Sequence, residues 1–170
     1  MTASHWGRLA VLGAAALAVV TCREPSPVGP PAASLLGGGI QIPGLLTCAP
    51  RPSDSVTRTI GSEGGVLQVG PHTLSVPAGA LVAPVTIMAV APSETVNQVR
   101  FQPEGLHFQQ PASLTLSYAN CDLLGLPLPP RIAYTTDALA ILEYLPSLDH
   151  AAAQRVTGEL GHFSSYAVAW

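Results

Sequence analysis

The sequence contains no lysine, because all seven of its basic residues are arginines. This absence excludes chemistry that depends on a lysine amine, such as a Schiff base, and it excludes a phosphate-binding loop that ends in lysine. Charged residues make up only 10% of the chain, with ten acidic side chains against the seven arginines. So sparse a positive charge cannot form the basic surface that binds a nucleic-acid backbone, and we expect no nucleic-acid partner.

The motifs of several enzyme classes are also missing. There is no Gly-x-Ser-x-Gly nucleophile motif and no phosphate loop. The histidines His72, His107, His150 and His162 do not have the spacing of metal ligands along the chain, so we expect no metal site and no cofactor. Proline (17 residues) and glycine (16 residues) are frequent instead, which favours an all-β domain with many turns.

Residues 1–21 have the pattern of an export signal. A weakly basic start, with His5 and Arg8, precedes an uncharged run over residues 9–21 (LAVLGAAALAVVT). This run is shorter than the roughly 20 residues that a membrane-spanning helix needs, so it is typical of a signal peptide rather than of an anchor. Removal of residues 1–21 would leave six arginines and ten acidic residues, a net charge of 6 − 10 = −4.

Cys22 follows this run directly and is a candidate for lipid attachment. The residues Val19-Val20-Thr21-Cys22 resemble the signal of bacterial lipoproteins, in which the cysteine receives diacylglycerol; Thr21 departs from the smaller residue that usually stands there. The alternative is an ordinary secretory signal that is cut nearby, for example after Ala18. The lipid would hold the protein on a membrane, at about 0.8 kcal/mol per buried CH₂. Because Arg23 is not the aspartate that favours inner-membrane retention, we expect an outer-membrane or cell-surface location, with a periplasmic or secreted protein as the alternative.

The chain has three cysteines, an odd number for an exported protein. If Cys22 carries a lipid, Cys48 and Cys121 remain to form a disulfide in an oxidising compartment. The alternative is a pair of reduced, buried thiols. The sequence therefore predicts a Cys48–Cys121 bridge together with the lipid site.

Composition divides the remaining chain into a tether and a domain. Residues 22–54 are rich in proline and glycine and have neither a helical nor a strand period, so we expect a tether whose leucine pairs at 35–36 and 45–46 dock on the domain or on a partner. Residues 55–170 contain short apolar runs separated by turns, which predict about eight or nine strands in a single antiparallel β-sandwich. The expected strands include residues 66–69, 72–76, 85–90, 113–118, 132–134, 141–144, 154–160 and 162–170, the last four of them as two hairpins. A short helix over residues 138–145 is the weaker alternative, because Pro146 follows.

Two motifs stand in order along this domain. Residues 60–81 (IGSEGGVLQVGPHTLSVPAGAL) place a doubled glycine and a strand before Val-Pro-Ala-Gly-Ala, and residues 104–116 follow a Gly-x-x-Phe-x-x-Pro-x-x-Leu-x-Leu pattern. Together they resemble the ZU-five family, a β-sandwich of zonula occludens proteins, Unc-type netrin receptors and ankyrins. The resemblance covers residues 60–118, and residues 161–166 are similar to the family's closing strand. It implies a ZU-five-like β-sandwich with a binding or structural role and no particular ligand.

Local chemistry within these motifs predicts two details of the fold. Pro77 cannot donate a strand hydrogen bond and Gly79 permits a left-handed turn, so the two indicate a tight corner between sheets. Phe108 and Pro111 are expected to pack where the chain enters the strand that contains Leu114.

The triplet His162-Phe163-Ser164 carries the one catalytic hypothesis. Some ZU-five proteins cut themselves at a His-Phe-Ser sequence, and nuclear pore autoproteases use the same triplet on another fold. The resemblance implies that Ser164 Oγ attacks the Phe163 carbonyl with His162 as base, and that water hydrolyses the resulting ester. The alternative is structural: Phe163 lies in the core, and Ser164 and Ser165 face solvent. We expect no enzyme, with self-cleavage as the enzymatic alternative.

The expected function is that of a non-catalytic, lipid-anchored envelope or surface module, which contacts an unidentified envelope or surface protein or has a structural role. The eukaryotic partners of the family, such as spectrin, are not expected for a bacterial lipoprotein. A second alternative is binding of envelope glycans on an aromatic platform. Its candidate residues are Tyr118, Tyr134, Tyr144, Tyr166 and Trp170, although core packing is the commoner use of tyrosines at strand positions.

Overall fold

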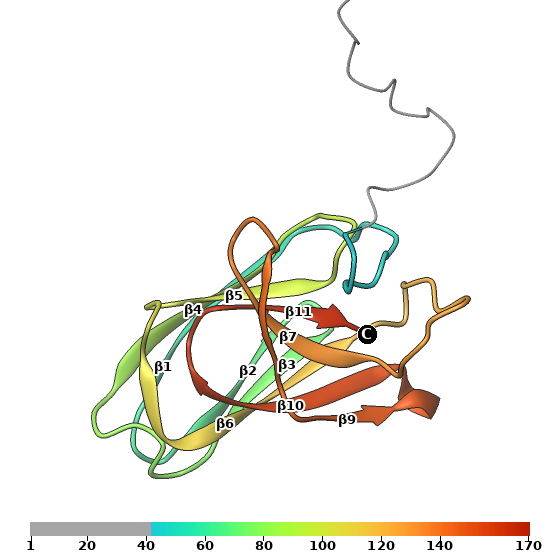
Figure 1. Cartoon of the computed structure of the whole chain (residues 1–170). Helices are drawn as coiled ribbons and strands as arrows, with labels where there is room; N and C mark the ends of the chain where they lie inside the picture. Colours follow the sequence, from blue (N-terminus) through green and yellow to red (C-terminus); the bar gives the residue numbers. More distant parts are fainter. Residues whose placement is uncertain (1–41) are drawn as a thin grey trace, which may run out of the picture. The chain divides into compact units, whose positions relative to one another are not determined.

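The computed structural model describes residues 42–170, which form an all-β structure with two antiparallel sheets (Figure 1). The expected signal peptide, Cys22 and the first part of the expected tether lie outside the described residues. Within residues 42–170 the only helical element is the short 3₁₀ turn η1 (Ala151–Ala153). No helix in this described part has the length and apolar character needed to cross a membrane.

The two sheets contain eleven strands in the described residues. The six-stranded sheet has the order β1-β4-β5-β11-β7-β8, and the five-stranded sheet has the order β2-β3-β6-β10-β9. The strands of the first are β1 (Asp54–Ile60), β4 (Val85–Ala91), β5 (Gln98–Gln102), β7 (Arg131–Thr135), β8 (Ile141–Tyr144) and β11 (Ser165–Ala169). The strands of the second are β2 (Gly65–Val69), β3 (His72–Val76), β6 (His107–Ser117), β9 (Ser147–His150) and β10 (Arg155–His162).

The strands that alternate cleanly in sequence are confirmed. β3 has the predicted bounds, and β7 and β8 form the predicted hairpin rather than the alternative helix. β1, β5 and β9 were not predicted. β5 begins with Gln98, a polar residue that is nevertheless buried, and its side chain donates a hydrogen bond to Glu94. β9 is a short edge strand that lacks an apolar pattern; Leu148 and His150 are exposed, and Ser147 and Asp149 are partly buried.

The expected hairpin of residues 154–160 with residues 162–170 is wrong. β10 pairs with β6 and β9, whereas β11 belongs to the opposite sheet and pairs with β5 and β7. The chain crosses between the sheets at Phe163, whose ring is fully buried between Phe101 (5.0 Å between centroids) and Phe108 (4.9 Å). Burial of this ring therefore draws the chain through the core where a glycine-based turn had been expected.

The corner predicted at Pro77 and Gly79 is present. Gly79 has a φ of +79°, and its N–H donates to the Ser62 carbonyl at 2.8 Å. The chain passes here from β3 in one sheet to β4 in the other. Of the two residues expected to pack at the entry to β6, Phe108 is half-buried against Phe163, but Pro111 is exposed.

The main hydrophobic core lies between the two sheets. It contains the inward-facing side chains of nearly every strand, among them Leu67, Leu74, Ile87, Leu114, Leu116, Ile132 and Val168. The alternation along β6, where Ala112, Leu114 and Leu116 are buried, is the period-two pattern of a strand with one face in the core. Tyr118, which follows β6, continues this buried face as predicted.

A second, smaller cluster covers the outer face of the six-stranded sheet. There Ala133, Ala167 and Ala169 alternate with core residues and pack against Leu45, Val96 and Leu139. Leu45 therefore lies on the outer face, whereas the next residue, Leu46, enters the main core. Residues 42–53, which were expected to belong to the tether, thus include residues that pack into the domain, because an extended segment places consecutive side chains on opposite sides.

His72 on β3 is a buried polar group that makes the folded state sensitive to pH. It is 3% exposed, and its Nδ1 accepts a hydrogen bond from the Ser117 N–H at 3.2 Å. Burial, followed by the charges of Arg51 and Arg155, lowers the pKa of His72 from 6.5 to about 4. The neutral imidazole therefore belongs to the folded state.

We expect the free energy of unfolding to fall as the pH decreases from 6.5 to about 4. In this pH window the unfolded chain takes up a proton on His72 and the folded chain does not. The stabilisation of the folded state by the neutral imidazole is therefore complete above pH 6.5, and its loss lowers the free energy of unfolding by about 3 kcal/mol. Denaturant unfolding of wild type and His72→Asn at several pH values measures it. Asparagine can accept the same hydrogen bond but does not titrate, so parallel pH profiles for the two proteins would contradict the assignment.

Candidate functional site

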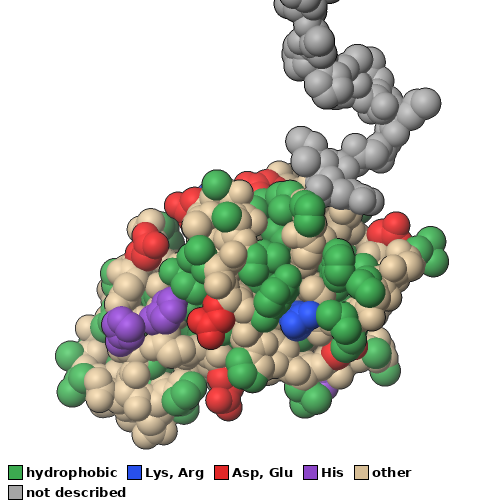
Figure 2. Space-filling view, in the orientation of Figure 1, with side chains coloured by type: hydrophobic (Ala, Val, Ile, Leu, Met, Phe, Trp, Pro, Cys, Tyr) green, Lys and Arg blue, Asp and Glu red, His purple; other side chains and the backbone are tan. Residues whose placement is uncertain are grey.

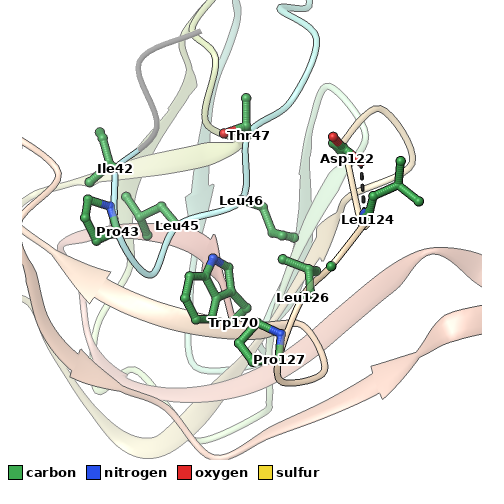
Figure 3. A pocket seen from close by; sticks show the side chains of 11 residues that line it. Ile42, Pro43, Leu45, Leu46, Thr47, Asp122, Leu124, Leu126, Pro127 and Trp170 are labelled. Atoms are coloured by element: carbon green, nitrogen blue, oxygen red, sulfur yellow. Dashed lines mark hydrogen bonds between the residues drawn. The ribbon is translucent and has the colours of Figure 1, made fainter. Parts of the chain in front are cut away.

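A groove lined by apolar side chains, by Thr47 and Asp122 and by backbone lies where the described chain begins. Figure 3 shows Trp170 in the middle of it, with Ile42, Pro43 and Leu45 on one side and Leu126 and Pro127 on the other. Its volume is about 400 Å³. The groove joins segments that are far apart in sequence: residues 42–47, the loop between β6 and β7, and the residue after β11.

Backbone contacts and a disulfide hold these segments together. Cys48 and Cys121 form the predicted disulfide. On either side of it the Asp122 N–H donates to the Thr47 carbonyl, and the Ala49 N–H donates to the Asn120 carbonyl, both at 2.8 Å. The groove wall formed by residues 42–47 is therefore covalently tied to the wall formed by the β6–β7 loop.

The buried side-chain amide of Asn97 forms hydrogen bonds beside the disulfide. Asn97 Nδ2 donates to the Ser117 carbonyl at 2.8 Å and to Asn120 Oδ1 at 2.7 Å. The Cys48 N–H donates to the Thr95 carbonyl at 2.7 Å, so the segment before β5 belongs to the same network. Nothing in the sequence around Asn97 indicated this role, because the contact joins residues from separate loops.

Exposed apolar side chains are frequent in the β6–β7 loop and in the edge strands β8 and β9. Six of the eight large hydrophobic residues exposed in the described chain fall between residues 123 and 148: Leu123, Leu124, Leu128, Leu142, Tyr144 and Leu148. We call these six residues the apolar edge. Figure 2 shows hydrophobic side chains gathered on the face of the domain that it presents. Leu124 is the most exposed of them, at 89%.

Arg131 on β7 contacts Tyr144, one of the residues of the apolar edge. The guanidinium carbon of Arg131 lies 4.2 Å from the centroid of the Tyr144 ring, a cation–π contact between adjacent strands β7 and β8. Nearby, the Tyr118 hydroxyl donates to Asp149 at 2.5 Å; burial, and then this bond and the charge of Asp149, raise the pKa of Tyr118 to about 12. This tyrosine stays neutral and joins the end of β6 to β9.

The proposed aromatic platform for glycans is not assembled as a unit. Tyr118 and Tyr166 are each only 1% exposed and belong to the main core. Tyr144 and Trp170 are accessible at the groove and the apolar edge. The commoner use of strand tyrosines, packing in the core, applies to Tyr118 and Tyr166.

The triplet His162-Phe163-Ser164 lies at the crossing between the sheets. The Phe163 carbonyl accepts a hydrogen bond from the Gly105 N–H at 2.9 Å and lies 3.4 Å from His162 Nδ1. Ser164 is 6% exposed and Ser165 is 5% exposed, so the expectation that both face solvent is wrong. Ser165 Oγ donates a hydrogen bond to Asp137 at 2.8 Å.

This geometry supplies part of what self-cleavage requires. A backbone N–H on the Phe163 carbonyl is the type of donor that stabilises an oxyanion. However, the nearest polar contact of the His162 ring is that carbonyl, and no hydrogen bond joins His162 to Ser164 Oγ within residues 42–170. A base for the serine hydroxyl is therefore not in place in this conformation.

The comparisons with known proteins leave the family open. No protein-family model matches the chain, and no curated protein matches it. The ZU-five resemblance therefore stays a prediction, whereas the all-β sandwich and the disulfide rest on the structure itself.

Proposed function

We propose that this protein is an exported, lipid-anchored, non-catalytic module of the cell envelope that binds another envelope or surface protein through its apolar edge. The observation that carries the proposal is the concentration of exposed leucines between residues 123 and 148. Large apolar patches on a soluble domain mark sites of interaction. The groove beside Trp170 continues this surface toward residue 42.

The two pairs of edge strands differ in a way that favours a protein partner. At one side, β1 and β2 are tied to each other, because Arg58 donates to the Val66 carbonyl and the Gly70 N–H donates to Asp54 at 2.6 Å. At the other side, β8 and β9 are the last strands of their sheets. An edge strand presents backbone groups that another polypeptide can pair with, which a lipid or a glycan cannot do in the same regular way.

The side chains on the β8–β9 side have the composition of a protein interface. Tyrosine and arginine are the residue types that most often dominate binding energy, and Tyr144 and Arg131 already contact each other there. Leu142 on β8 and Leu148 on β9 add exposed apolar area on these two edge strands, and charged residues are few in the chain as a whole. The expected occupant is therefore a protein segment that adds to β8 or β9 and covers the leucines.

Site-specific photocrosslinking in the cells that make the protein tests this surface. With the probe at position 142 or 148, we expect a discrete adduct with a second protein species. Val66 and Val82 are also exposed hydrophobic residues, at 49% and 85%, but lie outside the apolar edge, so they are matched control positions that should give no such adduct. Equal adducts at all four positions, adducts with lipid alone, or adducts only between copies of this chain would contradict the proposal.

The lipid anchor rests on the Val19-Val20-Thr21-Cys22 sequence and on the pairing of the other two cysteines. Because Cys48 and Cys121 form a disulfide, Cys22 is the one cysteine left for modification. Ile42, at the groove, lies 42 − 22 = 20 residues after it. Fully extended, that stretch spans at most about 70 Å, so the domain would work close to the membrane that holds the lipid.

Metabolic labelling with palmitate tests the anchor. We expect wild type to incorporate label and to fractionate with membranes, because the acyl chains insert into the bilayer, and Cys22→Ala to lose both properties. The Cys22→Ala protein should still contain the Cys48–Cys121 disulfide, which serves as the folding control. Absence of label in wild type, or equal label in Cys22→Ala, would exclude lipidation at this residue.

Self-cleavage between Phe163 and Ser164 is the second candidate, favoured by the hydrogen bond from Gly105 to the Phe163 carbonyl. Since His162 contacts that carbonyl and not the serine, we expect the exported protein to keep its full-length mass under denaturing, non-reducing conditions. A species lacking residues 164–170, abolished by Ser164→Ala but kept in Ser165→Ala, would establish self-cleavage instead.

A further inference from the structure

His107 and His162 face each other across neighbouring strands. They are paired in the register of β6 and β10, with ring centroids 5.7 Å apart. Fifty-five positions separate them in sequence (162 − 107), so no motif spacing reveals the pair. A bulge between Leu160 and His162 shifts the register at this point and brings the two rings to the same place. Figure 2 shows two histidine side chains next to each other at the surface.

The surroundings of His162 favour one of its ring nitrogens as the one available to a ligand. Its Nδ1 lies 3.4 Å from the Phe163 carbonyl oxygen, which can only accept a hydrogen bond, so the contact favours the proton on Nδ1. Nε2 then carries a free lone pair. Donation of the second ring N–H to a backbone carbonyl is the arrangement found in histidines that bind metals, because it fixes the tautomer and the ring orientation.

The ring of His162 is also held in position by its neighbours. Tyr134 packs edge-on against it, with 5.0 Å between centroids, and the Tyr166 hydroxyl donates to the His162 carbonyl at 2.6 Å. His107 is exposed, so its ring can rotate toward a shared ligand. One histidine is thus fixed in advance and the other can adjust.

The space in front of the two rings suits a hydrated cation. It is a depression of about 240 Å³ lined by Glu104, Gly105, His107, Tyr134, His162, Phe163 and Ser164. Apart from the two histidines, Glu104 is the one lining residue with a charged side chain, a carboxylate. None of the lining residues is an arginine. A positive ion therefore meets imidazole nitrogens and a carboxylate rather than a like charge.

We propose that His107 and His162 bind a divalent transition-metal ion of the Zn²⁺ and Cu²⁺ type through one nitrogen of each imidazole. Imidazole favours these ions, whereas Ca²⁺ and Mg²⁺ prefer oxygen ligands. Within residues 42–170, no group of three histidine, cysteine or acidic side chains is arranged to hold a metal. In the proposed site two protein nitrogens therefore hold the ion, and water fills its other positions.

Binding of Cu²⁺ and of Zn²⁺ to the purified full chain tests the proposal. Electron paramagnetic resonance of bound Cu²⁺ should show splitting from two nitrogens in wild type, and from fewer in His107→Gln and His162→Gln. Calorimetric titration with Zn²⁺ should show affinity lowered by more than about tenfold in either variant, since even the outer partners of metal ligands are worth that much. His150→Gln, which removes a histidine from the far edge strand β9, should bind like wild type.

The His107→Gln variant separates an effect on metal binding from an effect on folding. His107 is exposed, so His107→Gln should unfold at the wild-type temperature and lose only the ion. Failure of wild type to bind Cu²⁺ or Zn²⁺, or binding that His107→Gln leaves unchanged, would overturn the proposal. The result is independent of the lipid anchor and of the apolar edge, because neither contributes a residue to the depression.

Discussion

The structure depends on how residues 45–48 are fixed to the rest of the domain. Leu45 packs on the outer face of the six-stranded sheet, Leu46 enters the main core, and Cys48 is bonded to Cys121. Burying a leucine contributes about 1.5–3 kcal/mol, and a bridge across a separation of 73 residues contributes roughly 4 kcal/mol on the chain-entropy view. Without this segment the outer alanines lose their cover and the groove loses one wall. If a lipid at Cys22 anchors the protein, force applied through residue 42 reaches the Cys48–Cys121 disulfide after only six residues (48 − 42).

The two sides of the sandwich differ in how their edge strands are protected. The β1–β2 side is closed by side chains that bond to the neighbouring strand, such as Arg58 to the Val66 carbonyl. On the opposite side, residues 42–45 and the β6–β7 loop cover the ends of the sheet but leave β8 and β9 as edges with leucines exposed. Natural sheets usually protect such edges with charge, proline or a covering segment. An edge that keeps apolar side chains in a chain with only 10% charged residues is explained most simply by a partner that covers it.

The sequence predicted those features of the fold that depend on a local pattern of residues. The alternation in β3 and β6, the β7–β8 hairpin and the left-handed turn at Gly79 depend on a few neighbouring residues, and all are present. It did not predict β5, where a buried glutamine depends on Glu94, or the crossing at Phe163, where burial of one ring decides which sheet β11 joins. The His107–His162 pair was missed for the same reason. Register between distant strands decides which side chains meet, and a bulge shifts that register without a signal in the sequence.

His162 is where the two chemical interpretations of this molecule exclude each other. As the base for Ser164, the ring must offer a lone pair toward the serine hydroxyl; as a metal ligand, it must offer Nε2 to the depression and keep its proton on Nδ1. The contact of Nδ1 with the Phe163 carbonyl favours the second state. The hydrogen bond from Gly105 to that same carbonyl does not decide between them, because it also completes the backbone pairing at the crossing, where Phe163 N–H donates to the Leu106 carbonyl. A His-Phe-Ser triplet is thus compatible with a structural corner: the phenylalanine fills the core, the carbonyl orients the histidine, and the imidazole is left facing outward.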